Sequence, residues 1–313
     1  MLRALCLVLL AAAPAGYPAD WQSQPAGSGG PLPVVTTSTD LKALVEAVGR
    51  NRVLVESLAP PLHDPHAVDV KPGQLAKLKA AALLVRIGLD HEPWLTRALR
   101  SVNDPRFTRG SPHDLDASKG IRLLQAETPR IRGERGVHVH GFGNTHYWLD
   151  PENARPITAA IFEALARLAP AHRADFEANR KRFLERLDAG LTRWSEAMAP
   201  YRGARVVVVH ETWPYFAERF GLVVVAAVEP TPGVPPSPAY LASLTQKMKA
   251  AGVKLLIAEP SANASVVGQV AARSGARVVT LNPSVGGDPE ARDYLALFDL
   301  NIKRLTEALT AAR

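Results

Sequence analysis

The sequence predicts an α/β protein with two lobes, each built on a parallel sheet, that are joined by one long helix. Apolar, strand-like runs alternate with helical patterns, which is typical of parallel sheets with crossover helices. This alternation occurs once before and once after a helical pattern that continues from residue 170 to residue 199. The length of 313 residues is enough for two domains of ordinary size.

The first lobe is expected to cover residues 32–169. Ser38 or Thr39 is placed to cap a helix whose apolar positions follow the 3.6-residue period and whose end is marked by Gly49. A second helical stretch precedes the third apolar run. The strands expected in this lobe are 34–37, 53–58 and 83–87.

The linking helix is expected over residues 170–199. Pro170 suits the first turn, and apolar side chains recur at helical spacing as far as Met198. At 1.5 Å per residue such a helix is roughly 45 Å long, which is enough to connect two lobes stiffly. The second lobe covers residues 200–313 and repeats the plan of the first. Its expected strands are 206–209, 222–228, 255–258 and 278–281.

The composition is that of a globular protein. Apolar residues make up 47% and charged residues 21% of the chain, which excludes a disordered chain and a membrane bundle. The net charge is +7, but the basic residues are scattered among acidic ones and no recognition motif occurs. We therefore expect no nucleic-acid partner. The protein is also expected to be a monomer.

The N-terminus predicts export. Residues 1–19 have the layout of a signal peptide, with a cation at Arg3 and a short apolar run, and residues 20–31 form a flexible leader rich in Gly, Ser and Pro. The single cysteine, Cys6, lies inside the signal, which excludes disulfides, zinc fingers and cysteine nucleophiles in the mature chain. Its position within the apolar run argues against a lipid anchor. We expect a periplasmic protein that does not insert into the membrane after cleavage.

Metal-binding residue types follow several expected strands. Ligands of open α/β sheets bind beyond the carboxyl ends of the strands, and donors from both lobes would meet there. Imidazole with carboxylate suits Zn²⁺, Mn²⁺ or Fe²⁺, so the sequence predicts a metal site in the cleft between the lobes. The candidates are His63, His66, His146, His210, Glu259 and Asn282.

Three motifs resemble those of the periplasmic zinc and manganese solute-binding proteins of ABC transporters. They are HDPH at 63–66, HYWLDP at 146–151 and HETWPYF at 210–216. The resemblance implies metal ligands at His66, His146 and His210, and delivery of the ion to a membrane permease. Zinc-type members carry histidine at the third position, whereas manganese-type members usually carry a carboxylate. The resemblance therefore implies Zn²⁺ ahead of Mn²⁺ or Fe²⁺.

The fourth ligand departs from the family pattern. The aspartate that the family carries after the last strand corresponds here to Asn282, whose neutral amide is a weak zinc donor. Glu259, after the neighbouring strand, is the preferred replacement, although water could also complete the shell. Glu259 would alternatively accept hydrogen bonds from the start of the following helix.

The other histidines receive weaker assignments. His138 and His140 resemble a short form of the histidine-rich loop of zinc-type members, and they would either aid ion capture or be incidental. His63 is expected to be an outer or alternate donor. Residues 90–92, including His91, are expected to orient the cleft rather than bind metal. His113 and His172 lie in polar contexts and are expected to be solvated.

Two other functions are compatible with three histidines. A zinc-dependent hydrolase would add a water molecule and a general base such as Glu259 or Glu211, but no H-E-x-x-H motif occurs. A periplasmic metallochaperone would use the same site to load another protein. The solute-binding function remains the main prediction.

Overall fold

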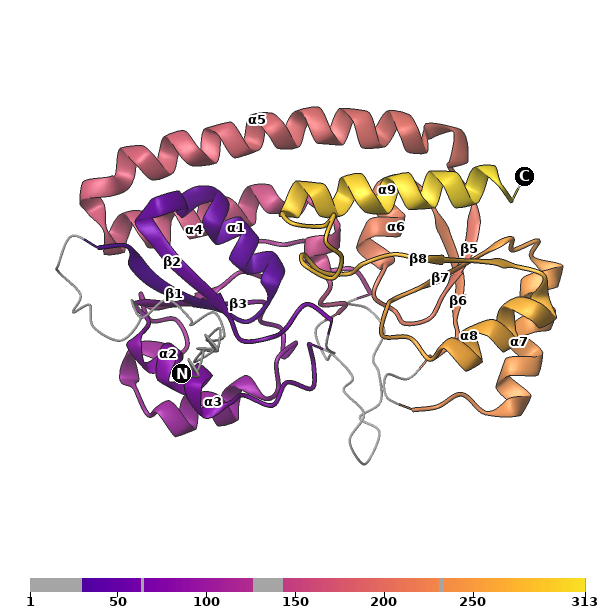
Figure 1. The fold of residues 1–313 in the computed structure, drawn as a ribbon, viewed down its shortest axis with the longest axis horizontal. Helices are drawn as coiled ribbons and strands as arrows, with labels where there is room; N and C mark the ends of the chain where they lie inside the picture. The colour runs from indigo at the N-terminus through magenta and orange to yellow at the C-terminus, as the bar shows by residue number, and fades with distance from the viewer. Residues whose placement is uncertain (1–29, 63–64, 126–142, 231–233, 313) are drawn as a thin grey trace, which may run out of the picture.

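The computed structural model describes residues 30–62, 65–125, 143–230 and 234–312, and each lobe of this part contains a four-stranded parallel sheet (Figure 1). The strand order is β2-β1-β3-β4 in the N-terminal lobe and β6-β5-β7-β8 in the C-terminal lobe. The prediction of two parallel-sheet α/β lobes joined by a long helix is confirmed. The strands are β1 Leu32–Thr36, β2 Val53–Ser57, β3 Leu83–Arg86, β4 Asp114–Asp116, β5 Arg205–Val208, β6 Val223–Ala227, β7 Leu255–Ala258 and β8 Arg277–Thr280.

Helices connect the strands and cover both faces of each sheet. Their bounds are α1 Thr39–Gly49, α2 Pro72–Ala80, α3 Leu95–Val102, α4 Ala154–Leu168, α5 Arg173–Met198, α6 Pro214–Phe220, α7 Pro238–Ala250, α8 Ala264–Ser274 and α9 Tyr294–Thr310. Among the residues described, no helix has both the length and the apolar character needed to cross a membrane. The expected signal peptide and most of the leader, residues 1–29, lie outside the described residues.

Helix α1 shows how local chemistry sets the bounds. The Leu41 amide donates to Ser38 Oγ at 3.1 Å, so Ser38 is the N-cap. At the other end a Cβ on Gly49 would lie 2.4 Å from a methyl group of Val53, so only glycine fits where β2 begins. The chain then turns at Arg50, which has a φ of 49°.

Alternate residues of each strand enter different cores. In β1, Val34 faces α1, α4 and α5, whereas Val35 faces α2 and α3. In β5, Val206 faces α5, α6 and α9, whereas Val207 faces α7 and α8. The core beneath α5 is continuous from one lobe to the other, so the lobes share an interior rather than a narrow linker.

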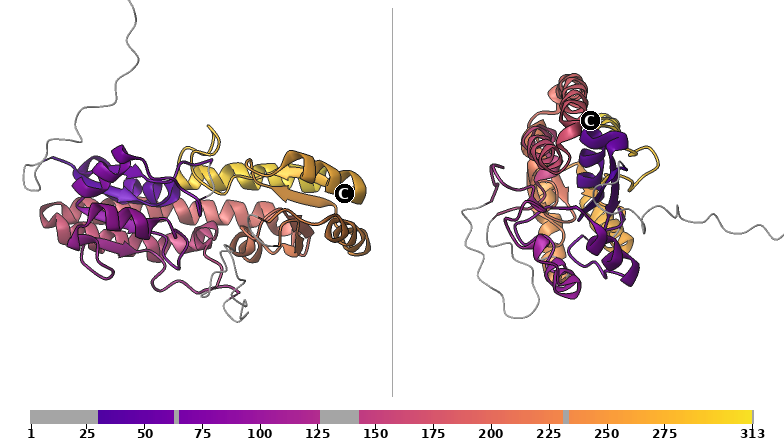
Figure 2. Two further views of the ribbon diagram at one scale, coloured as in Figure 1. Left: turned by 90° about the horizontal axis from the view of Figure 1, so that it is seen from below. Right: turned by 90° about the vertical axis from the view of Figure 1, so that its left-hand side faces the viewer.

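Helix α5 spans both lobes, as Figures 1 and 2 show. Its 26 residues are about 39 Å long, and the expected first turn at Pro170 is a separate 3₁₀ turn, Pro170–His172. Helix α9 packs along α5 and also touches α1 of the other lobe. This second brace was not expected from the sequence, because the pattern of α9 is that of any amphipathic helix.

Candidate metal centre

Three histidines come together beyond the carboxyl ends of the N-terminal strands. One potential ligand atom from each of His66, His91 and His146 lies within 4.8 Å of the others. The ring centroids of His66 and His91 are 4.2 Å apart, and that of His146 lies 5.5 Å and 5.3 Å from them. His91 is fully buried and the other two are half-buried. Three imidazoles at this spacing are a donor set for a transition metal.

The Nδ1 atom of each ring contacts an oxygen. Nδ1 of His66 donates to the His91 carbonyl at 2.8 Å, and Nδ1 of His146 contacts Asn144 Oδ1 at 3.2 Å. Nδ1 of His91 lies 2.7 Å from Thr145 Oγ1, a hydroxyl that can donate or accept. A histidine whose Nδ1 hydrogen is bonded in this way coordinates metal through Nε2. The contacts therefore favour Nε2 as the coordinating atom of His66 and His146, and of His91 when its Nδ1 donates to Thr145.

A tryptophan fixes the loop that carries His66. Trp94 stands at the start of α3, and its Nε1 donates to the Pro65 carbonyl at 2.8 Å. The amide of Gln74, in α2, likewise donates to the Leu58 carbonyl at 2.8 Å where the loop leaves β2. The His66 loop is thus attached to both helices on one face of the sheet.

A strained turn after β3 carries His91. Gly88, Leu89 and Asp90 all have positive φ, of 80°, 56° and 56°, a conformation that costs a non-glycine residue roughly 1–2 kcal/mol. The Glu92 carboxylate holds the turn, because it accepts hydrogen bonds from the amides of Ile87 at 2.6 Å and Gly88 at 3.1 Å. Burial raises the pKa of Glu92 to about 7, although these bonds act in the opposite direction.

His146 lies at the junction of the lobes. Its partner Asn144 also donates through Nδ2 to the carbonyl of Glu211, the residue after His210, at 2.8 Å. Trp148 lies two residues after His146, and its ring centroid is 5.2 Å from those of both His91 and His146. Its Nε1 donates to the Pro283 carbonyl at 2.9 Å. The histidine group is therefore tied directly to the C-terminal lobe.

The candidates of the C-terminal lobe stand outside this group of ligand atoms. His210 and Glu259 follow the neighbouring parallel strands β5 and β7, on one sheet edge as expected. His210 keeps 30% of its side chain exposed, and its Nδ1 lies 3.4 Å from Glu229 Oε2. It does not belong to the cluster of ligand atoms found among the described residues.

Glu259 is a buried carboxylate, 5% exposed. Its Oε1 accepts from Trp213 Nε1 at 2.7 Å, and within the described residues Oε2 has no hydrogen-bond partner. Burial raises the pKa of Glu259, and the charge of nearby His210 opposes that rise. A cation beside Glu259 would offset the cost of its buried charge.

Asn282 is held by other residues. In the amide orientation that satisfies both ends, its Nδ2 donates to the Gly287 carbonyl at 3.2 Å and its Oδ1 accepts from Arg304 at 3.1 Å. Its backbone exchanges hydrogen bonds of 2.9 and 2.8 Å with the side chain of Asn301. Within the described part of the chain these contacts engage the Asn282 side chain inside the C-terminal lobe, whereas Glu259 keeps one buried oxygen without a hydrogen bond.

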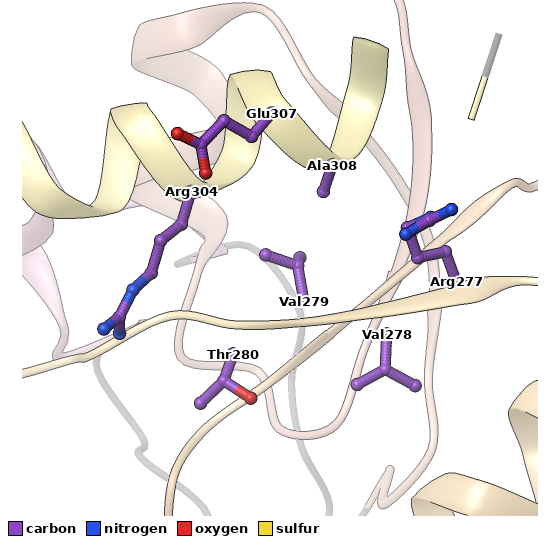
Figure 3. Close-up of a pocket in the computed structure, with 7 residues that line it drawn as sticks. All are labelled: Arg277, Val278, Val279, Thr280, Arg304, Glu307 and Ala308. Carbon is purple, nitrogen blue, oxygen red and sulfur yellow. The ribbon is translucent and has the colours of Figure 1, made fainter. Parts of the chain in front are cut away.

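The remaining candidates are separate from the group. His63, His138 and His140 lie outside the described residues. Nδ1 of His113 contacts the Ala82 carbonyl at 2.7 Å, and His172 pairs weakly with Asp175 at 3.8 Å. A pocket of about 560 Å³ between β8 and α9 is lined by residues such as Val279 and Arg304 (Figure 3) and includes no histidine among its described lining residues.

His91 is the residue that sequence reasoning did not assign as a donor. It follows β3, the neighbour of β1 in the sheet, so the same strand-end rule that selects His66 after β2 also applies to it. Its place between two acidic residues, Asp90 and Glu92, favoured a role in orienting the cleft over metal binding.

The chain is similar to known proteins of metal binding and metal uptake. A putative metal-binding protein of Treponema pallidum is 26% identical over 283 residues, covering 88% of this chain and 87% of that protein. The high-affinity zinc uptake system protein ZnuA of Yersinia pestis is 25% identical over 267 residues, covering 81% and 83%. A crystal structure of ZnuA superposes with a TM-score of 0.74 at 25% identity, covering 89% of this chain and 99% of that one. Residues 34–308 match the family of the periplasmic component A of zinc-uptake complexes, and the chain belongs to this ZnuA family.

Proposed function

We propose that this protein captures a divalent transition metal outside the cytoplasm, zinc in preference to manganese, and delivers it to the permease of an ABC transporter. The observation that supports this most directly is the convergence of three imidazoles at the lobe junction of a member of a zinc-uptake family. Nitrogen donors suit Zn²⁺ better than Mn²⁺, which prefers oxygen ligands.

The ligands in this proposal come from both lobes. His66 and His146 hold the ion on the N-terminal side, and His210 and Glu259 approach from the strand ends of the C-terminal sheet. Glu259 would bring a negative charge that partly neutralises the +2 ion in a buried setting. Residues 1–19 would direct export, and the mature protein would act as a monomer.

The hydrolase alternative receives no support. The matched family and the relatives are proteins of metal uptake and metal binding, not enzymes. No observation favours a metallochaperone over delivery to a permease.

Metal analysis of protein purified without chelators or a histidine tag tests the proposal. We expect one tightly bound zinc per chain, and tighter binding of zinc than of manganese in chelator competition. Deleting the gene should slow growth in zinc-depleted medium, and added zinc should restore growth. Tighter binding of manganese would overturn the choice of zinc, and normal growth without the gene would argue against a role in uptake.

A further inference from the structure

The turn that presents His91 is built to hold that side chain in one place. Thr37, at the end of β1, donates through Oγ1 to Glu92 at 2.6 Å, and Glu92 in turn receives the amides of Ile87 and Gly88. The Tyr147 hydroxyl donates to the Ile87 carbonyl at 2.8 Å. The turn is therefore fastened to β1 and to the segment that follows His146.

Strain marks the same turn. Leu89 and Asp90 keep left-handed backbone conformations that side chains disfavour, and such strain persists only where the surroundings impose it. Its effect here is to place His91 beside His66 and His146 instead of in solvent. The strained backbone of Leu89 and Asp90 therefore determines where the imidazole of His91 lies.

The contacts of His91 match those of a metal ligand. It is fully buried, and its Nδ1 faces Thr145 Oγ1, so that Nε2 is the coordinating atom when Nδ1 donates. In a tetrahedral zinc shell with Zn–N distances of about 2.0–2.1 Å, neighbouring nitrogens are about 3.3 Å apart. One potential ligand atom from each of the three histidines lies within 4.8 Å of the others, which is about 1.5 Å more than that spacing.

We propose that His91 is a direct metal ligand, and that His66, His91 and His146 form a three-histidine site that binds zinc within the N-terminal lobe without His210. The inference rests on the proposed function, since it concerns the same cargo. It assigns His210 and Glu259 to the completion of a site that the N-terminal lobe already forms.

Zinc titration of the full chain by chelator competition tests the assignment. His91→Ala and the ring-retaining His91→Phe should both weaken zinc binding by more than the roughly 10–100-fold that loss of an outer-shell partner costs. Thr145→Val, which removes only the Nδ1 partner, should stay within that range. His113→Ala is the matched control, a histidine with its own Nδ1 contact outside the group, and should bind zinc as the wild type does.

X-ray absorption of the zinc-loaded proteins counts the imidazoles directly. We expect one imidazole fewer in His91→Phe than in the wild type, and at least three in His210→Ala, which should still bind one zinc. Wild-type affinity and an unchanged imidazole count in both His91 variants would overturn the inference while leaving the proposed function intact. A wild-type protein that binds no zinc would contradict both.

Discussion

The two halves of the candidate metal centre differ in how many contacts hold their side chains in place. In the N-terminal half each histidine has an oxygen at Nδ1, and both loops are tied to neighbouring elements. In the C-terminal half His210 stays partly exposed and contacts Glu229, and Glu259 has one buried oxygen without a hydrogen bond among the described residues. Preorganisation lowers the cost of binding, so the first half should supply most of the affinity and the second half charge and closure.

Removing a ligand from each half tests this difference most strongly. His66→Ala should weaken zinc binding by more than about 100-fold, because its loss exceeds that of any outer-shell partner. His210→Ala should weaken binding less, since the preorganised group of His66, His91 and His146 stays intact. Chelator competition measures both, and a larger loss in His210→Ala would show that the C-terminal half dominates.

The next largest effect should be on the free energy of unfolding, and it concerns Asp40, which contacts the other lobe. Asp40, at the start of α1, accepts from the Val285 amide at 2.9 Å, and burial raises the pKa of Asp40 to about 7. The folded protein therefore keeps a proton on Asp40 between about pH 4 and pH 7 where the unfolded chain has lost it, so this group destabilises the fold as the pH rises.

Asp40→Asn removes that penalty. Relative to the wild type, the metal-free variant should gain about 2–3 kcal/mol of unfolding free energy between pH 5 and pH 8, measured by urea denaturation. Asp69→Asn, a substitution of an aspartate whose side chain is 85% exposed, is the control and should show little change. A pH dependence shared by wild type and Asp40→Asn would mean that Asp40 ionises normally.

The charge that the C-terminal half supplies can be removed separately. Glu259→Gln should weaken zinc binding by about ten-fold or more if Glu259 acts on the ion, and should stabilise the metal-free protein, because a buried carboxylate becomes neutral. Asn282→Asp should change zinc affinity little, because this side chain contacts Arg304. Isothermal titration measures the zinc affinity of both variants, and unchanged affinity in Glu259→Gln would remove Glu259 from the expected ligands.

The smallest change in zinc affinity should come from Trp94, which holds the His66 loop in the N-terminal half of the site. Trp94→Phe removes the hydrogen bond to the Pro65 carbonyl, worth about 1 kcal/mol, so zinc affinity should fall about five-fold. Trp194→Phe removes a similar bond, to Asp299 at 2.7 Å, between α5 and α9 and should leave zinc affinity unchanged. Equal affinities in the two variants would indicate that the His66 loop keeps its position without Trp94.

Local patterns in the sequence predict most of the fold. Apolar runs predict seven of the strands described, and the helical period predicts α5. Strand β4 was not predicted, because Asp114 and Asp116 make its sequence polar. In the structure Arg86, on the neighbouring strand, pairs with both carboxylates. Such a buried ion-pair group is a property of the tertiary structure.

The residues of the candidate site likewise fall into those that the sequence predicts and those that depend on tertiary structure. The strand-end rule identifies His66, His210 and Glu259, because a parallel sheet brings its carboxyl ends to one edge. His91 depends on two non-glycine residues in left-handed conformations, which no local preference predicts. The contacts of Asn282 depend on Arg304, in a helix near the end of the chain, and so become visible only in three dimensions.

The core shared beneath α5 has a consequence for how the protein melts. Side chains of both sheets enter one continuous apolar cluster, so opening either lobe would expose surface that the other lobe needs covered. The lobes should therefore unfold together, in one cooperative transition whose calorimetric and van't Hoff enthalpies agree. An ion that binds at the junction would then raise the melting temperature of the whole molecule, including α7 and α8 at its far end.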